Sequence, residues 1–157
     1  MVSLEADESA HPAERRLVLR LLRHWRELCQ GKEMPAATAV QSDAIPDIWP
    51  CCYLLDIASG AVSPRLENIG SSFEDEITMN GGCHALSEVP VDTLLGQATL
   101  YWRKVVEKRV PISIGGEFRH RDGRLILYRS IILPLSADER QIDHLLGAAN
   151  YRAVVSS

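Results

Sequence analysis

Residues 65–72, RLENIGSS, decide the fold of this chain, because the spacing of the apolar residues changes there. The first five of them alternate between polar and apolar side chains, as in a strand with one buried face. The glycine and the two serines that follow tolerate the tight turn that ends such a strand. The compact apolar run CCYLLDI, residues 51–57, lies before this stretch, and we expect it to pair with residues 65–69. Two strands therefore come first, and the residues after the break are predicted to be helical.

Residues 90–109, PVDTLLGQATLYWRKVVEKR, are predicted to form one long amphipathic helix that lies across the sheet. Pro90 suits its first turn, Asp92 suits the positive end of the helix dipole, and Pro111 ends the helix. Residues 71–89 are predicted to hold only short helical turns. The predicted buried face of the long helix consists of Leu94, Leu95, Ala98, Tyr101, Trp102, Val105 and Val106.

Three strand-like runs follow in close succession, over residues 112–118, 125–135 and 141–152. The pair Asp122-Gly123 is a strong signal for a two-residue hairpin between the first two runs. Residues 125–135 are the longest and most apolar run, so we expect this strand to lie centrally in the sheet. The order of two strands, helices and three strands is compact enough for one domain of the α+β class.

The residues before the first strand divide into a tail and a helix. Residues 1–13 are predicted to be a flexible tail, and residues 14–31 are predicted to be an amphipathic helix that stops at its glycine. Residues 43–153 then form the domain proper. Leaving the apolar stripe of the helix in water would forfeit roughly 1.5–3 kcal/mol per large side chain, so the sheet or a second subunit must cover it.

We predict a homodimer through this stripe, with an interface formed by Leu17, Leu21, Trp25 and Leu28. The charges are also unevenly distributed, since residues 14–33 are mainly basic and residues 65–92 are mainly acidic. This pattern fits either two solvated faces or two complementary docking surfaces of a dimer. Sedimentation at high protein concentration tests the homodimer, and a monomer under those conditions would contradict it.

The composition limits the classes of function. A chain of 157 residues with 46% hydrophobic residues is long enough for one globular domain with a real core. Its net charge of −4 argues against a general nucleic-acid binder. No apolar stretch approaches the ~18 residues that membrane insertion needs, and the first nine residues lack the apolar run of a secretory signal. We therefore expect a cytoplasmic protein whose four cysteines are free thiols.

Several short motifs follow one another in an order that is characteristic of a known family. They are WREL at 25–28, IPDIWP at 45–50, YLLD at 53–56, IGS at 69–71, LPLS at 133–136 and IDHLLG at 142–147. Through these motifs the chain from about residue 17 to residue 152 resembles the PAS domains, in particular a small bacterial branch in which the domain stands alone. The resemblance implies a five-stranded antiparallel sheet with helices on one face and a cavity between them. It also implies an N-terminal helix that packs on the sheet or mediates dimerisation.

Domains of this family bind small molecules or partner proteins and are seldom catalytic. The resemblance therefore implies a non-catalytic sensory or signalling module that acts in trans on another signalling protein. The ligand-pocket candidates are Phe73, Leu95, Trp102 and Tyr128, although core packing is the commoner fate of such side chains. No catalytic residue and no metal ligand is predicted, and the chain is not expected to be an enzyme.

The alternative is a redox or gas sensor that binds haem or flavin. Residues 91–108 contain no histidine that could ligate a haem, and His84 lies in an irregular segment before them. The Asn-Cys-Arg-Phe-type motif of flavin photosensors is absent as well, so no cofactor is expected. Residues 115–118, GGEF, resemble part of the diguanylate cyclase signature but have one acidic residue where that signature needs two, which indicates a strand with a flexible glycine pair. An enzyme would need His84 or His144 beside Ser71 in a closed pocket.

Overall fold

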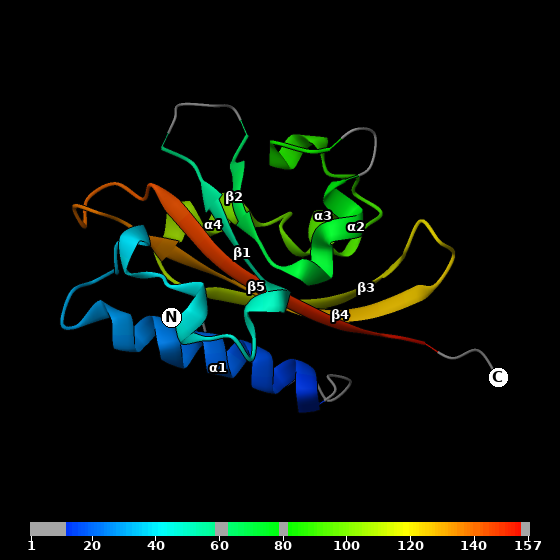
Figure 1. The fold of residues 1–157 in the computed structure, drawn as a ribbon, viewed down its shortest axis with the longest axis horizontal. Coiled ribbons are helices and arrows are strands. Elements are labelled where there is room, and N and C mark those ends of the chain that lie inside the picture. Colours follow the sequence, from blue (N-terminus) through cyan, green and yellow to red (C-terminus); the bar gives the residue numbers. More distant parts are fainter. Residues whose placement is uncertain (1–11, 59–62, 79–81, 155–157) are drawn as a thin grey trace.

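The computed structural model describes residues 12–58, 63–78 and 82–154, so the predicted tail up to residue 11 lies outside the described residues. The five strands form one antiparallel sheet in the order β2-β1-β5-β4-β3 (Figure 1). The strands are β1 (Cys52–Asp56), β2 (Arg65–Ile69), β3 (Ile112–Arg119), β4 (Leu125–Leu135) and β5 (His144–Ala153). The α-helices are α1 (Pro12–Cys29), α2 (Glu74–Ile77), α3 (Leu94–Ala98) and α4 (Trp102–Lys108). Single turns of 3-10 helix are η1 (Ala37–Ala39), η2 (Ser42–Ala44), η3 (Trp49–Cys51), η4 (Ser71–Phe73) and η6 (Leu86–Glu88).

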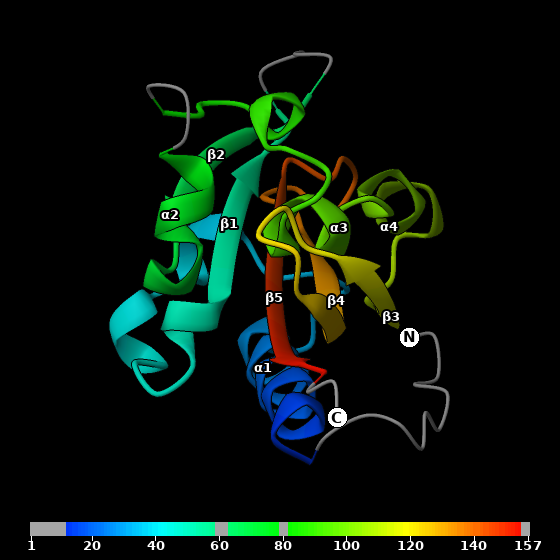
Figure 2. The same cartoon turned by 90° about the vertical axis from the view of Figure 1, so that its right-hand side faces the viewer.

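Helices cover both faces of the sheet. α2, α3 and α4 lie on one face and α1 lies on the other, as Figures 1 and 2 show. The predicted architecture is confirmed: the protein is α+β, with a five-stranded antiparallel sheet, short helices on one face and the extra N-terminal helix on the other. β4 is the longest strand, but β5 rather than β4 occupies the middle of the sheet. Among the described residues, every helix falls short of the length and apolarity needed to span a bilayer.

The prediction of one long helix over residues 90–109 is wrong, because two short helices, α3 and α4, occupy this stretch. α3 begins only after Thr93, whose Oγ1 caps the helix by accepting a hydrogen bond of 3.1 Å from the Gly96 amide. It ends at Thr99, whose Oγ1 donates back to the Leu95 carbonyl oxygen at 2.7 Å. Side-chain bonds of this kind compete with the backbone ladder of a helix. The chain therefore turns between α3 and α4. Of the predicted buried face, Leu94, Leu95, Ala98 and Val105 are buried, and Tyr101, Trp102 and Val106 are half-buried.

α1 packs against β4 and β5 of its own chain. Leu17, Leu21 and Trp25 are buried, whereas Leu28 is half-buried. The Trp25 indole also donates a hydrogen bond of 2.9 Å to the Pro134 carbonyl oxygen of β4. The sheet of the same chain thus covers most of the apolar stripe that was predicted to form the dimer interface. The homodimer itself stays a prediction.

The observed bounds of α1 lie two residues earlier than the predicted range 14–31 at each end. Proline is favoured in the first turn of a helix, because its missing amide hydrogen needs no partner there. The helix stops after Cys29 because Gln30 and Gly31 have left-handed φ angles of 46° and 83°. Such a left-handed exit is common at the carboxyl end of helices.

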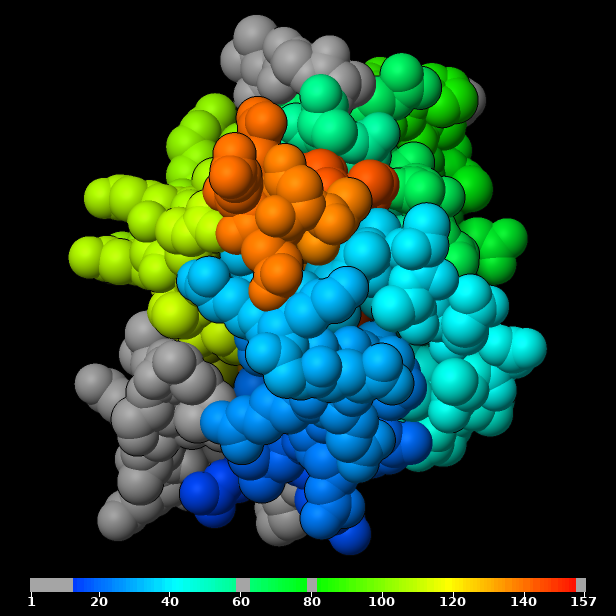
Figure 3. All heavy atoms as spheres, turned by 90° about the vertical axis from the view of Figure 1, so that its left-hand side faces the viewer, coloured from blue at the N-terminus to red at the C-terminus, as the bar shows by residue number. Residues whose placement is uncertain are grey.

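The loop between β4 and β5 lies against the segment that follows α1 (Figure 3). The Ser136 amide donates a hydrogen bond of 2.9 Å to the Pro35 carbonyl oxygen, and the Glu33 amide donates one of 2.8 Å to the Glu139 carboxylate. From the other layer, the Arg109 guanidinium at the end of α4 donates to the Glu139 carbonyl oxygen at 2.9 Å. The two helical layers are therefore joined at this end of the sheet.

Leu21 and Leu19 of α1 provide a matched pair for testing the contact between α1 and the sheet, because Leu21 is fully buried and Leu19 is 51% exposed. We expect Leu21→Ala to lower the free energy of unfolding by about 2–5 kcal/mol, since it removes apolar contacts and leaves a cavity. Leu19→Ala should change it by less than about 0.5 kcal/mol. Urea denaturation of both variants measures the difference, and equal unfolding midpoints would show that α1 does not pack on the sheet in solution.

Candidate functional site

The four predicted pocket residues are distributed over the core and the surface. Phe73 and Leu95 are fully buried in the core, and Tyr128 packs edge-on against Phe118 with ring centroids 5.8 Å apart. Trp102 is half-buried and lines two separate hollows beside α4. As contacts of a ligand, all four stay predictions.

The space between the sheet and the helices is filled where Tyr53 enters it from β1. Tyr53 is fully buried, and its ring meets Phe73 edge-on with centroids 5.9 Å apart. Gly147 of β5 lies under this ring, and a Cβ atom at that position would come within 2.2 Å of the Tyr53 Cζ atom. Only glycine allows so close an approach. Side chains therefore occupy this part of the interior.

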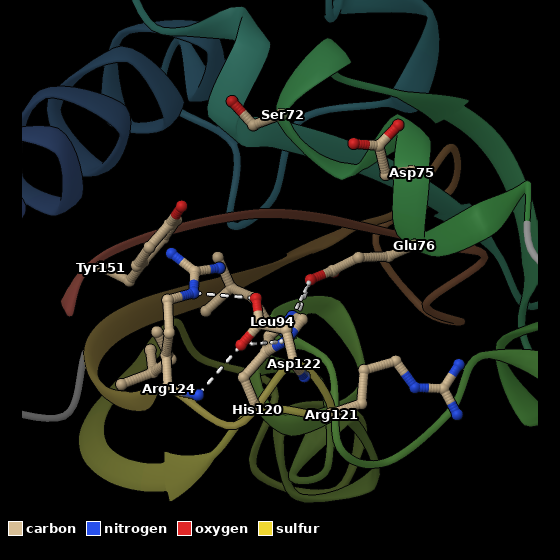
Figure 4. Close-up of a pocket in the computed structure, with 10 residues that line it drawn as sticks. Ser72, Asp75, Glu76, Leu94, His120, Arg121, Asp122, Arg124 and Tyr151 are labelled. Atoms are coloured by element: carbon tan, nitrogen blue, oxygen red, sulfur yellow. Dashed lines mark hydrogen bonds and ion pairs between the residues drawn. The ribbon is translucent and has the colours of Figure 1, made fainter.

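A cavity of about 420 Å³ lies nearer the hairpin that joins β3 and β4. Figure 4 shows it between η4 and α2 on one side and the hairpin with the end of β5 on the other. Its volume falls within the range of roughly 300–1,000 Å³ that is typical of small-molecule sites. It is lined by Ser72, Asp75, Glu76, Leu94, His120, Arg121, Asp122, Arg124, Ile126 and Tyr151.

Glu76 is the buried acidic residue of this cavity, and it connects α2 to α3. Its Oε2 atom accepts a hydrogen bond of 2.9 Å from the Leu94 amide, and its Oε1 atom accepts one of 2.8 Å from the Leu95 amide. These amides belong to the first turn of α3 and have no partner within the helix. A negative charge is also favourable at this end of a helix. Glu76 therefore caps α3 from outside, in addition to the cap that Thr93 provides within the chain.

His120 extends the same network to the hairpin. Its Nε2 atom lies 3.3 Å from the Oε2 atom of Glu76, and its Nδ1 atom accepts a hydrogen bond of 3.2 Å from the Asp122 amide. In the tautomer that accepts this bond at Nδ1, the Nε2 proton points to the carboxylate of Glu76. One buried carboxylate thus joins α2, α3 and the β3–β4 hairpin.

Charged residues of the hairpin form the rim of the cavity. The Arg124 amide donates to the Oδ1 atom of Asp122 at 3.0 Å, and the Arg124 guanidinium donates to Oδ2 at 2.8 Å. The hydrogen bond from the Arg124 backbone amide lowers the pKa of Asp122 the most, and the hydrogen bond from the Arg124 guanidinium lowers it further. The guanidinium also lies over the Tyr151 ring, 5.6 Å from its centroid, and its pKa is raised by the bond to Tyr151 and then by the bond to Asp122. Arg121 pairs with Asp92 at 3.4 Å and points away from the centre of the cavity (Figure 4).

Asp75 and Ser72 lie on the opposite side of the cavity from this rim. Ser72 Oγ is 3.6 Å from the Cys51 thiol. Within the described part of the chain, no hydrogen bond or ion pair involves the Asp75 carboxylate. The apolar part of the wall comes from Leu94 and Ile126, which are both buried. The cavity therefore offers an apolar surface together with the exposed carboxylate of Asp75.

The structure describes the surroundings of Ser71, His84 and His144. Ser71 is exposed at the start of η4, and no hydrogen bond joins it to His84 or His144 in the described chain. The His84 amide donates to the Glu88 carboxylate, and the His144 ring lies against carboxylates at the beginning of β5. Neither histidine is therefore hydrogen-bonded to Ser71 among these residues.

Burial favours the protonated thiol in three of the cysteines. Burial raises the pKa of Cys29, Cys52 and Cys83, and in Cys83 the nearby Glu88 adds to the effect. A thiol with a raised pKa stays protonated at neutral pH and is a weak nucleophile.

Sequence reasoning did not find Glu76 or His120 as site residues. One signal was available for His120, because it comes just before the predicted Asp122-Gly123 hairpin. Glu76 gave no comparable signal, because in the sequence it is only one member of a short acidic run. The two residues are 44 positions apart, and only the folded chain brings them together.

No protein-family model and no curated protein matches this sequence. The fold is similar to that of several solved structures. The light state of the blue-light photoreceptor Aureochrome1 LOV is 13% identical, with a TM-score of 0.47 over 74% of this chain and 90% of that chain. The Rhodobacter sphaeroides LOV protein is 12% identical, with a TM-score of 0.44 over 68% of this chain and 60% of that chain. VqmA bound to DPO is 12% identical, with a TM-score of 0.43 over 64% of this chain.

The match spans about half of the VqmA chain, 51% of its length. At these identities and TM-scores, the likeness to LOV proteins and VqmA concerns the fold only. It indicates neither a ligand nor a mechanism for this protein.

Glu76→Gln tests the role of the buried carboxylate. An amide has one acceptor oxygen, so its NH2 group would face a backbone amide of α3, and one buried donor would lose its partner. We expect the free energy of unfolding at pH 7 to fall by about 1–3 kcal/mol. Glu74→Gln, at an exposed position of the same helix, is the control and should have almost no effect. Equal urea midpoints for the two variants would contradict the capping role.

Proposed function

We propose that this protein is a non-catalytic sensory module that binds a small molecule in the cavity between α2, α3 and the β3–β4 hairpin. The observation that carries the proposal is the position of Glu76 in the wall of this cavity, where one carboxylate holds three elements together. A molecule that enters the cavity contacts the same wall. Its binding energy can therefore change how these elements are held relative to one another.

The chemistry of the cavity indicates the kind of molecule that fits it. Asp75 supplies a carboxylate without a partner among the described residues, and Leu94 and Ile126 supply an apolar surface. A carboxylate accepts hydrogen bonds and attracts positive charge. We therefore propose a small molecule that carries an amine or another strong donor beside an apolar part.

Signalling then follows from a shift between two arrangements of the cavity wall. A ligand shifts such an equilibrium only by the difference between its affinities for the two states, which is typically 1–3 kcal/mol, about 5- to 150-fold. That difference is similar to the net free energy of a few hydrogen bonds, so the bonds of Glu76 are strong enough to transmit it. In this proposal a second protein, bound in trans, recognises the new position of the hairpin or of α3.

Homodimerisation belongs to the proposal as well. Because the sheet covers Leu17, Leu21 and Trp25, a dimer built on this stripe requires that α1 exchange between two chains. Analytical ultracentrifugation over a range of concentrations distinguishes this arrangement from a monomer. An exchanged dimer that forms on refolding at high concentration supports it, and a monomer at every concentration excludes it.

Native mass spectrometry of freshly purified protein tests the ligand. We expect a bound small molecule of one copy per chain in the wild type, and its loss in Asp75→Arg, because the arginine both fills the cavity and reverses the charge. Glu74→Arg places the same side chain on the same helix outside the cavity lining and should retain the molecule. The absorption spectrum of the same sample separates a colourless ligand from haem or flavin.

Two results would contradict the proposed site. One is equal retention of the small molecule in Asp75→Arg and Glu74→Arg. The other is a wild-type protein that carries nothing and whose amide NMR signals do not move on titration with simple alkylamines such as butylamine.

A further inference from the structure

Three potential metal ligands converge at the other end of β5 from the cavity. Asp56 is the last residue of β1, Glu67 lies in β2, and His144 is the first residue of β5. These strands are neighbours in the sheet, and one ligand atom from each residue lies within 4.8 Å of the other two. All three side chains are partly exposed, so a solvated ion can reach them.

The register of the sheet explains the convergence. Asp56 and His144 are direct cross-strand partners, so their side chains lie on the same face. On the other side of β1, Leu55 pairs with Leu66 and Leu54 pairs with Asn68, which leaves Glu67 as an extra residue in a bulge. Bulges commonly re-aim a side chain near the edge of a sheet. Here the bulge brings the Oε2 atom of Glu67 to 2.9 Å from the Nε2 atom of His144.

The spacing of the ligand atoms suits a tetrahedral ion. The Nε2 atom of His144 lies 2.9 Å from Glu67 Oε2 and 4.0 Å from Asp56 Oδ1. Two ligands that are each ~2.0–2.1 Å from a tetrahedral zinc ion lie about 3.3–3.4 Å apart. The observed distances fall on either side of this value. Small rotations of the two carboxylates would therefore place all three ligands around one ion.

The far side of the imidazole ring is already held in the orientation of a metal ligand. Asp143 Oδ1 lies 2.7 Å from the Nδ1 atom of His144, and Asp143 Oδ2 accepts a hydrogen bond of 2.9 Å from the Ala137 amide. A carboxylate that accepts the Nδ1 proton leaves Nε2 available for a metal ion, as in many zinc sites. Asp56 is oriented similarly, because its Oδ1 atom accepts the Ala58 amide at 2.8 Å.

The charge balance around the ring also favours a cation. Three carboxylates, those of Asp56, Glu67 and Asp143, lie around one imidazole, which carries at most a single positive charge. Among the described residues, Arg65 is the cross-strand partner of Asp56, but no ion pair joins it to this group. Carboxylates that crowd together without enough positive charge repel one another. A divalent cation removes this repulsion.

We propose that Asp56, Glu67 and His144 form a zinc site, with Asp143 as the residue that orients the histidine and with water as the fourth ligand. The mixed nitrogen and oxygen ligands suit Zn²⁺, whereas Ca²⁺ and Mg²⁺ prefer oxygen ligands only. The ion ties the edge strand β2 to β1 and to the central strand β5. This site is separate from the cavity beside α2, so the two proposals are tested independently.

Isothermal titration of the full, chelator-treated protein with zinc chloride tests the site. We expect one Zn²⁺ per chain in the wild type. Asp143→Asn should weaken binding by about 10- to 100-fold, because a residue that orients a ligand has effects of this size. Glu67→Gln, which removes a ligand, should weaken it at least as much. Glu117→Gln, at an exposed position of β3, is the matched control and should leave the affinity unchanged.

Two further measurements separate this site from other ways of binding zinc. Zinc should raise the melting temperature of the wild type and of Glu117→Gln but not that of Glu67→Gln. Glu67 is 46% exposed, so Glu67→Gln is expected to fold even if variants of His144 do not. Co²⁺ in place of zinc should give visible d–d bands without the near-ultraviolet band of a cobalt–thiolate bond.

The proposal fails under any of three results. These are a wild-type protein that does not bind zinc, equal zinc affinity in the wild type and Glu67→Gln, and a cobalt–thiolate band. The last result would assign the metal to the cysteines, and the first would leave the cluster as a group of surface ion pairs.

Discussion

The burial of β4 and β5 on both faces is the constraint on which the rest of the structure depends. α1 covers one face of these strands, and α3 and α4 cover the other. β4 is buried along nearly its whole length from residue 126 onward, and residues 145–149 of β5 are buried as well. Because apolar side chains of both faces must leave water together, neither helical layer is an optional addition to the sheet. The contacts of Trp25 with Pro134 and of Arg109 with the β4–β5 loop join the two layers to this centre.

Two groups of polar side chains lie at opposite ends of the sheet. At one end, Glu76 reaches the amides of α3 and the ring of His120 beside a cavity. At the other end, Asp56, Glu67 and His144 meet across three strands. Between them, Tyr53 packs over Gly147 of the central strand. A buried polar group is stable only when it is hydrogen-bonded or paired, which explains why the buried carboxylate of Glu76 forms a network.

Most of the secondary structure could be predicted because it depends on local patterns. The alternation in residues 65–69 and the apolar run 125–135 lie within single strands, and the hairpin between β3 and β4 was located correctly. The prediction of a two-residue turn at Asp122-Gly123 is wrong, because the Gly123 amide bonds back to the His120 carbonyl oxygen at 2.8 Å and, of the two residues, only Gly123, with φ 94°, is left-handed. The break between α3 and α4 could not be predicted, because the apolar stripe continues across residues 99–101. The break comes where the Thr99 hydroxyl bonds back to the Leu95 carbonyl oxygen. The pattern of apolar residues does not show this competition between a side chain and the backbone. The surface that covers the apolar stripe of α1 could not be predicted either, because such a stripe predicts burial but does not indicate which element buries it.

The sequence by itself therefore determined which segments are strands, that the chain is α+β, and that α1 has an apolar face, because periodicity and turn chemistry act between residues close in the chain. Only the tertiary structure decided that α1 lies on β4 and β5, that Phe73 and Leu95 belong to the core, and that Glu76 meets His120. The same is true of Asp56, Glu67 and His144, which depend on strand order and on one bulge in β2. Contacts between residues tens of positions apart are selected by the packing of the whole chain, and no local pattern encodes them.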